Sequence, residues 1–174
     1  MKWLASILSV AGAGAVVACS AGTDPPQQGS ITVTFPSVSA AVATDSLQLE
    51  VFDAPDSSTC LDLVEKRKTG QELPPPLVER QPVPTCTFVE NKAAPLEVGY
   101  GRRAFLVVGV GCGRAAGAGS AERPPQPCLI GCALQGVGNA KIVVDVPLTL
   151  FSNTVDIPAT TCTQLSVKCS GGCK

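Results

Sequence analysis

The sequence has no histidine, and only 16% of its 174 residues are charged. Histidine is the usual general base beside a serine or cysteine nucleophile and the commonest side-chain ligand of zinc. Its absence excludes Ser-His-Asp triads and histidine-containing zinc sites. The 13 basic and 14 acidic residues form no long run of one sign. Because nucleic acids and anionic lipid surfaces attract concentrated basic patches, neither is an expected partner of the chain.

The apolar segment at the start of the chain is too short for a membrane-spanning helix. Residues 4–17 contain only Leu, Ala, Ser, Ile, Val and Gly, and they follow a single basic residue, Lys2. A membrane helix needs about 20 apolar residues, whereas an export signal needs fewer. The segment therefore predicts a removable signal peptide over residues 1–18.

The end of this segment resembles the lipobox of bacterial lipoproteins. It reads Val16-Val17-Ala18-Cys19, with the cysteine where the apolar segment stops. The resemblance implies cleavage before Cys19, attachment of diacylglycerol to its thiol and acylation of the new N-terminus. It also implies, from Ser20 at the next position, sorting towards the outer membrane. The alternative is an ordinary secretory signal cleaved nearby, with Cys19 incidental.

The lipid on Cys19 would make the membrane the first partner of the protein. Several acyl chains hold a protein on a bilayer without a transmembrane helix. Residues 19–30 are polar and rich in helix breakers, which indicates a tether. We expect a β-sandwich over residues 31–151 and a cysteine-rich C-terminal tail over residues 152–174. The tail should pack on that domain.

The remaining cysteines predict disulfides. Nine cysteines less Cys19 leave eight, and exported proteins form disulfides in an oxidising compartment. The candidates are Cys60, Cys86, Cys112, Cys128, Cys132, Cys162, Cys169 and Cys173. Five precede residue 133 and three follow it, so full pairing requires a bridge from the tail to the body. Of 105 pairings, one local bridge, Cys60 with Cys86, is preferred. The alternative is a four-thiolate metal site built from the two Cys-x-x-x-Cys pairs, Cys128/Cys132 and Cys169/Cys173.

The hydrophobic pattern predicts short strands. Residues 31–35 and 47–51 alternate at period two, and residues 142–150 do so around Pro147, which indicates an edge strand or a strand end. Residues 104–110 are apolar throughout, as in a central strand that is covered on both faces. Further strands are expected at residues 86–90, 96–99 and 128–134. One helix is expected at residues 59–68, where Thr59 and Asp62 have capping-box spacing. The proline-rich residues 71–84 predict an extended connection. The small residues at 36–45 predict a hairpin or a connecting loop.

Six or seven short strands with one short helix predict an all-β, disulfide-stapled β-sandwich. The order of elements resembles transthyretin-like and carboxypeptidase-regulatory-like sandwiches. The resemblance rests on residues 95–103 leading into the apolar strand, then a Gly-Cys and a closing alternating strand. It implies a structural or binding module without enzymatic activity.

Few residues suggest chemistry. Residues 109–113 are glycine-rich but lack the lysine of a phosphate-binding loop, so we interpret them as backbone made small for close packing. Asp53 and Asp56, with Asp62 and Glu65 nearby, could supply oxygens to calcium, although a solvated turn and a helix cap explain them too. An envelope hydrolase would need an acid pair such as Asp53 and Asp62 facing a cleft.

The expected function is therefore that of a lipid-anchored, non-enzymatic module of the bacterial cell envelope. It should work without a cofactor or metal, and its partner is an unidentified envelope protein or ligand. The alternatives are a small-ligand or calcium-binding lipoprotein and an envelope hydrolase.

Overall fold

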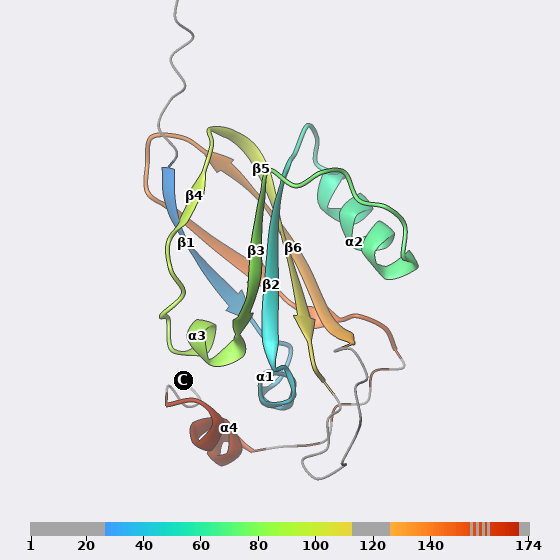
Figure 1. Cartoon of the computed structure of the whole chain (residues 1–174), viewed down its shortest axis with the longest axis vertical. Helices are drawn as coiled ribbons and strands as arrows, with labels where there is room; N and C mark the ends of the chain where they lie inside the picture. The colour runs from blue at the N-terminus through green and yellow to red at the C-terminus, as the bar shows by residue number, and fades with distance from the viewer. Residues whose placement is uncertain are drawn as a thin grey trace, which may run out of the picture.

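The described part of the chain folds into two β-sheets accompanied by four short helices (Figure 1). The computed structural model describes residues 27–112, 126–153, 155, 157, 159 and 161–170. Its elements are β1 (Gln27–Thr34), α1 (Val38–Ala43), β2 (Ser46–Asp53), α2 (Thr59–Thr69), β3 (Val78–Pro84), α3 (Thr85–Val89), β4 (Leu96–Val98), β5 (Gly101–Val110), β6 (Pro127–Val137), β7 (Ile142–Pro147), β8 (Thr149–Leu150) and α4 (Cys162–Lys168). The expected all-β, disulfide-stapled sandwich is confirmed. The first strand begins at Gln27, inside the segment that we expected to be a tether.

The two sheets differ in size and in strand direction. The smaller sheet has the order β4-β1-β7, and its β1 and β7 run parallel. The larger sheet has the order β3-β2-β5-β6-β8 and is antiparallel throughout. Pro147 ends β7, an edge strand, as the sequence predicted, because an edge tolerates a residue without a backbone N–H.

Strand β5 is the centre of the molecule, with both faces covered. Phe105 and Val107 face the smaller sheet and belong to the main core. Leu106 and Val108 face the other way and pack in a second cluster with Leu63 of α2. A strand buried on both faces needs an unbroken apolar sequence, which is the pattern that identified it.

Two expectations about local structure are wrong. Residues 86–90, expected as a strand, lie mostly in α3. Tertiary packing overrides the strand propensity of this segment, because the helical turn buries Phe88. Residues 36–45, expected as a hairpin or loop, contain α1, whose N-cap Ser37 accepts a hydrogen bond from the Ala40 N–H at 3.1 Å.

The proline-rich connection ends in a strand that we did not expect. Residues 78–84 form β3 at the edge of the larger sheet. Pro82 and Pro84 are tolerated there because an edge strand has one row of backbone groups without a strand neighbour. The extended conformation was therefore correct for this segment, but its pairing with β2 was missed.

The last predicted strand is divided between the two sheets. Ile142–Pro147 pairs with β1, whereas Thr149–Leu150 pairs with β6. The crossing is tight, because a Cβ on Gly131 of β6 would lie 2.3 Å from the Pro147 carbonyl oxygen. Glycine therefore allows the strand end to cross directly over β6.

Glycine also allows close packing in β5. A Cβ on Gly109 would lie 3.0 Å from the Leu129 Cβ and 3.1 Å from the Thr44 Cγ2. This contact confirms the interpretation of that glycine as a packing residue. Gly113, in the same motif, lies outside the described residues.

Three disulfides have both of their cysteines among the described residues. They are Cys60–Cys132, Cys86–Cys169 and Cys112–Cys128. The preferred pairing of Cys60 with Cys86 is wrong, since Cys60 lies on α2 over β6 while Cys86 lies on α3 beside α4. The required bridge from the C-terminal tail to the body is confirmed as Cys86–Cys169.

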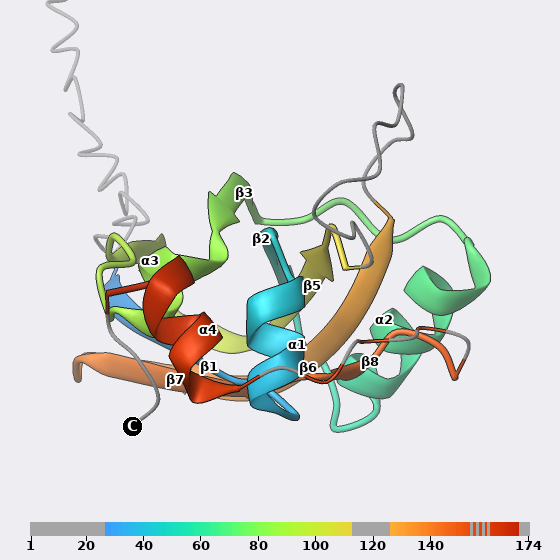
Figure 2. The ribbon, with the colours of Figure 1, turned by 90° about the horizontal axis from the view of Figure 1, so that it is seen from below.

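The helices occupy two places around the sandwich. Figure 1 shows α1, α3 and α4 at the lower end of the molecule, and Figure 2 shows α2 on the other side, beside β6. Ala41, Leu165 and Cys169 form the small apolar cluster at the helical end. Among the described residues, no helix has both the length and the hydropathy that crossing a membrane requires.

Candidate functional site

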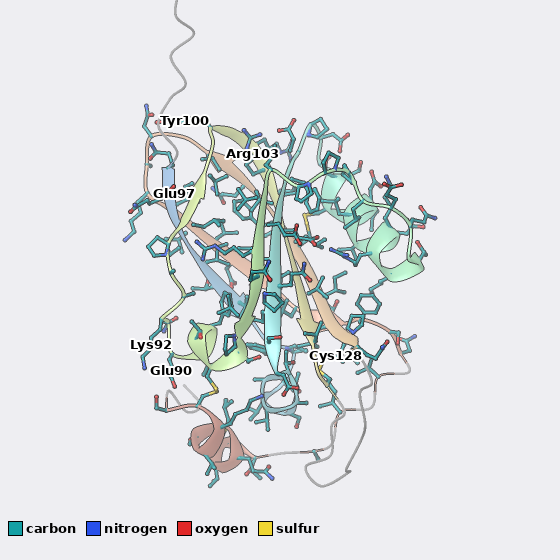
Figure 3. The ribbon with its side chains drawn as sticks, in the orientation of Figure 1. Glu90, Lys92, Glu97, Tyr100, Arg103 and Cys128 are labelled. Carbon is teal, nitrogen blue, oxygen red and sulfur yellow. A yellow bond between two sulfur atoms is a disulfide. The ribbon has the colours of Figure 1, made fainter. Side chains whose placement is uncertain are left out.

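The acidic residues proposed as calcium ligands or as a hydrolase pair hold local structure instead. Asp53 pairs with Arg103, which also donates from Nε to the Gly99 carbonyl at 3.1 Å. Figure 3 places Arg103 beside Tyr100 at the end of the molecule away from α3. Asp56 accepts hydrogen bonds from the N–H and hydroxyl of Ser58, both at 2.9 Å. These hydrogen bonds lower the Asp56 pKa, and the bond from the Ser58 hydroxyl has the largest effect.

No joint site is formed by these carboxylates. Asp62 and Glu65 are exposed on α2, and Asp62 accepts only a long bond of 3.4 Å from the Ser58 hydroxyl among the described contacts. Within residues 27–112, 126–153 and 161–170, no group of three or more acidic or cysteine side chains is placed to hold a metal ion.

The alternative four-thiolate site is contradicted by the disulfides. Cys128, Cys132 and Cys169 each bond to a cysteine outside the proposed set. A cysteine in a disulfide has no thiolate to offer a metal. Cys162 is also in a disulfide, while Cys19 and Cys173 lie outside the described residues.

A pocket lies where α2, the edge of the larger sheet and the proline-rich connection meet. Its volume is about 310 Å³. The lining residues are Glu50, Phe52, Arg67, Gln71, Glu72, Leu73, Pro74, Pro75, Pro76 and Glu79. In Figure 1 this connection runs from the end of α2 back to the start of β3. The volume falls at the lower end of the range for small-ligand sites.

Glu50, at the base of the pocket, is the one buried charged residue of the described chain. It pairs with Arg67 of α2, whose Nη2 contacts both carboxylate oxygens. A buried carboxylate requires such a partner, because leaving it unpaired in a poorly solvated place is costly. The pair also joins α2 to β2 beside the pocket.

The pairing of Arg67 is incomplete. Its Nε is buried and has no hydrogen-bond partner among the described residues. A buried unpaired donor costs about 1–3 kcal/mol. Unsatisfied groups of this kind are rare in native proteins and mark places that call for an explanation, which makes this pocket the leading candidate site.

A second carboxylate stands beside the buried one. Glu79 of β3 is the cross-strand partner of Glu50. Gln48 Nε2 donates to both carboxylates, at 3.2 Å to Glu50 and 3.3 Å to Glu79. Like charges opposite each other in a sheet destabilise it. The Gln48 amide and the Arg67 guanidinium offset this repulsion between Glu50 and Glu79.

The rest of the lining is mixed, since Gln71 and Glu72 are polar while Phe52, Leu73 and the three prolines are apolar. Phe52 of β2 is buried, and Leu73 packs against the cluster beneath α2. Pro74, Pro75 and Pro76 are exposed along the connection. Proline fixes the backbone of this wall without a flexible side chain. The pocket therefore combines fixed apolar walls with carboxylates.

No motif in the sequence marks this pocket as a site. One observation could have found it, since Gln48 and Glu50 lie on one face of the strand predicted at residues 47–51 and Phe52 follows on the same face of β2. A charged residue on the same face as a phenylalanine indicates a face that is only partly covered. The role of Arg67 could not be inferred, because only the fold brings α2 next to β2.

A separate polar cluster fixes the C-terminal segment. Glu90 accepts hydrogen bonds from the Ser170 N–H at 2.8 Å and from the Ser170 hydroxyl at 2.5 Å, and it pairs with Lys92 at 2.6 Å. Figure 3 places Glu90 and Lys92 together at the α3 end. The Lys92 ammonium has the largest effect and the Ser170 hydroxyl the next, and together they lower the Glu90 pKa to about 2.

Lys168 holds the same segment from the other side. Its Nζ donates to the carbonyl oxygens of Val42 at 2.6 Å and Thr44 at 2.5 Å. Burial lowers its pKa, and the Asp45 carboxylate opposes that effect. These contacts are internal, so this cluster fixes the tail and is not a binding site.

Comparisons of the chain with protein-family models, with curated proteins and with solved structures gave no match.

Proposed function

We propose that the protein is a non-enzymatic binding module that lipid on Cys19 holds at the bacterial cell envelope. The anchor is an expectation from the lipobox-like segment, and the outer membrane is the expected location. The module is the disulfide-linked sandwich. Its role is to present a fixed surface to an envelope protein or a ligand.

The observation that best supports this proposal is the set of disulfides that join α2 to β6, α3 to the end of α4, and the end of β5 to β6. Disulfides persist in exported proteins and are rare in the reducing cytosol. A cross-linked fold also keeps a binding surface in one conformation without the entropy cost of ordering it on binding.

The pocket beside α2 favours a second candidate function, a lipoprotein that binds a small ligand. A concave site with apolar walls and a few polar groups is the usual form of a small-molecule site. The two functions are compatible, because the anchor sets the location and the pocket sets the ligand.

The anchor is tested by expressing the full chain in a bacterial host that is fed a labelled fatty acid. We expect the wild-type chain to carry label and to sediment with membranes, and Cys19→Ser to do neither. Ser20→Asp serves as the matched control. It should keep the label but move towards the inner membrane, as the resemblance to lipoproteins implies.

Protease treatment of intact cells then reports the face of the membrane that carries the domain. Digestion places the partner outside the cell, and protection places it in the periplasm. An unlabelled wild-type chain, or label that persists in Cys19→Ser, contradicts the proposed anchor.

A further inference from the structure

We propose that one end of the sandwich lies on the phospholipid headgroups of the membrane that holds the anchor. This surface, which we call the tether end, consists of Gln27 at the start of β1, residues 99–102 between β4 and β5, and residues 138–141 between β6 and β7. The inference rests on the proposed lipid anchor at Cys19. It goes beyond the anchor, because it assigns the surface of the domain that meets the lipid.

The strand register brings the three segments of the tether end together. Gln27 pairs with Val98 at the end of β4, and Gly101 at the start of β5 pairs with Val137 at the end of β6. Strand β7 begins opposite Gly29. Figure 1 shows both turns at the upper end of the molecule, beside the start of β1 and away from α1, α3 and α4.

The tether is too short to let the opposite end of the domain reach the membrane. Gln27 is the eighth residue after Cys19, so the chain between them reaches at most about 28 Å. Strand β5 has 10 residues and spans about 30 Å, and a helix packed beyond its end adds about 10 Å. The helical end therefore lies about 40 Å from the start of β1. The anchor thus holds the tether end closer to the bilayer.

The tether end presents side chains that suit a headgroup layer. Arg102 and Lys141 are exposed, and neither has a carboxylate partner among the described residues. Both cations can donate hydrogen bonds to the phosphate groups of the lipids. Tyr100 is half-buried in the turn before β5. A tyrosine, which has an apolar ring and a polar tip, is favoured at a membrane interface.

The tether end as defined contains no carboxylate. Two carboxylates flank it. Asp53 pairs with Arg103, so its charge is balanced. Glu97 lies between two buried residues of β4, so its side chain points out from the face of the smaller sheet rather than from the end. The unbalanced charge of the tether end is therefore positive.

The turn that carries Tyr100 is fixed by hydrogen bonds. Arg103 donates from Nε to the Gly99 carbonyl at 3.1 Å and from Nη2 to the Tyr100 carbonyl. Gln27 Nε2 donates to the Tyr100 hydroxyl at 2.8 Å. Gly101 has a φ of +120°, which glycine adopts more readily than other residues. The surface is therefore formed before it meets lipid, which lowers the entropy cost of the contact.

The contacts at the tether end need not be strong. Arg102 and Lys141 form no concentrated basic patch, so the domain alone is not expected to bind lipid. The anchor changes this expectation, because it confines the domain near the bilayer and raises the effective concentration of the surface. Each cation then favours the seated orientation about fivefold on an anionic membrane.

Single tryptophans report the orientation. The only tryptophan of the chain is Trp3, inside the expected signal peptide, so the processed chain carries none. Tyr100→Trp and Asn139→Trp place a reporter in each turn of the tether end, and Asn139→Trp leaves Tyr100 in place. Val167→Trp is the matched control at the helical end, because that side chain of α4 is 83% exposed.

The experiment uses the full chain, expressed with a labelled fatty acid, purified in detergent and reconstituted into vesicles of phosphatidylethanolamine and phosphatidylglycerol. Half of the samples include a lipid with a nitroxide on its headgroup, which quenches tryptophan only at close range. We expect the nitroxide to lower the emission of Tyr100→Trp and Asn139→Trp and to leave that of Val167→Trp unchanged. Adding Cys19→Ser to Asn139→Trp should abolish the quenching, since the contacts are weak without the anchor.

Charge variants then assign the contact to the tether end. In the Asn139→Trp chain, Arg102→Gln and Lys141→Gln should each lower the ratio of quenched to unquenched emission, by up to about fivefold. Lys92→Gln is the matched control, because it removes a cation at the α3 end (Figure 3). It should leave the quenching unchanged.

Three outcomes overturn the inference. They are equal quenching of Val167→Trp and the tether-end reporters, no quenching of either tether-end reporter, and an equal loss of quenching in Lys92→Gln. The fatty-acid label separates this failure from that of the anchor. A labelled chain whose tether-end reporters stay unquenched refutes the orientation alone, whereas an unlabelled chain refutes the anchor and the orientation with it.

Discussion

Helix α2 is linked to β6 through Cys60–Cys132, and the residue after α4 is linked to α3 through Cys86–Cys169, but the contacts beneath the two helices differ. Helix α2 buries Leu63 against the outer face of β5 and β6 and ends at Gly70 in the left-handed conformation. Helix α4 buries Leu165 and leaves Val167 83% exposed. Leu63 of α2 joins a cluster of seven buried residues, whereas Leu165 of α4 joins a cluster of three, so α4 depends more on its disulfide and on polar contacts to backbone groups.

The two cross-links close loops of similar length. The sequence separations are 72 residues for Cys60–Cys132 and 83 for Cys86–Cys169. The chain-entropy model gives both about 4.5 kcal/mol. A measured difference between them would therefore report how each helix is docked in the native state.

The largest effect is expected from Cys60→Ser combined with Cys132→Ser. Removing this bridge should cost about 4 kcal/mol of global stability, because α2 covers a core cluster and cannot leave without exposing it. Denaturant unfolding followed by circular dichroism measures the loss. A loss below about 1 kcal/mol would show that packing alone secures α2.

The next effect tests the packing beneath α2 directly. Leu63→Ala should lower the free energy of unfolding by about 3 kcal/mol, since it leaves a cavity against β5. Leu61→Ala is the matched control on the same helix, because that side chain is 68% exposed. Similar losses in the two variants would contradict the docking of α2 through Leu63.

A smaller global effect is expected from Cys86→Ser combined with Cys169→Ser. Helix α4 can then detach locally, so global stability should fall by less than about 2 kcal/mol. Local release should expose Lys168, and trypsin should cut after it while the sandwich stays folded. Mass spectrometry of the digest identifies the cut. Resistance at Lys168 would show that polar contacts suffice to hold α4.

The smallest effect concerns pH. Because the pKa of Glu90 is lowered from 4.5 to about 2 in the folded chain, its contribution to stability is present above pH 4.5 and is lost as pH falls towards 2. Glu90→Gln should flatten that part of the stability curve. Thermal melting of both proteins between these pH values measures it, and an unchanged slope would contradict the role of Glu90.

The elements predicted well from the sequence are those in which the order of apolar and polar residues follows directly from the burial of the element itself. Residues 104–110 are apolar because β5 is covered on both faces, and Gly70 after three basic residues ends α2 as a C-cap should. Helix α4 was missed although Thr161 and Gln164 have capping-box spacing, and the Thr161 N–H does donate to Gln164 Oε1 at 2.7 Å.

The features that could not be predicted depend on contacts between distant segments. Residues 85–89 have strand propensity, but burial of Phe88 makes them helical. The pairing of Cys60 with Cys132 required knowing that α2 crosses β6. The pocket needed the same information, because Glu50 and Arg67 meet only when α2 packs against β5 and β6.

The position of β1 determines which hydrogen bonds bear a pulling force applied to the chain before Gln27. Strand β1 begins at Gln27 and lies between β4 and β7 in the middle of its sheet. Tension applied to the preceding chain therefore loads hydrogen bonds to both neighbouring strands at once. A membrane attachment at Cys19 would pull on the most laterally supported strand of that sheet, so the domain should resist mechanical extraction better than one tethered through an edge strand.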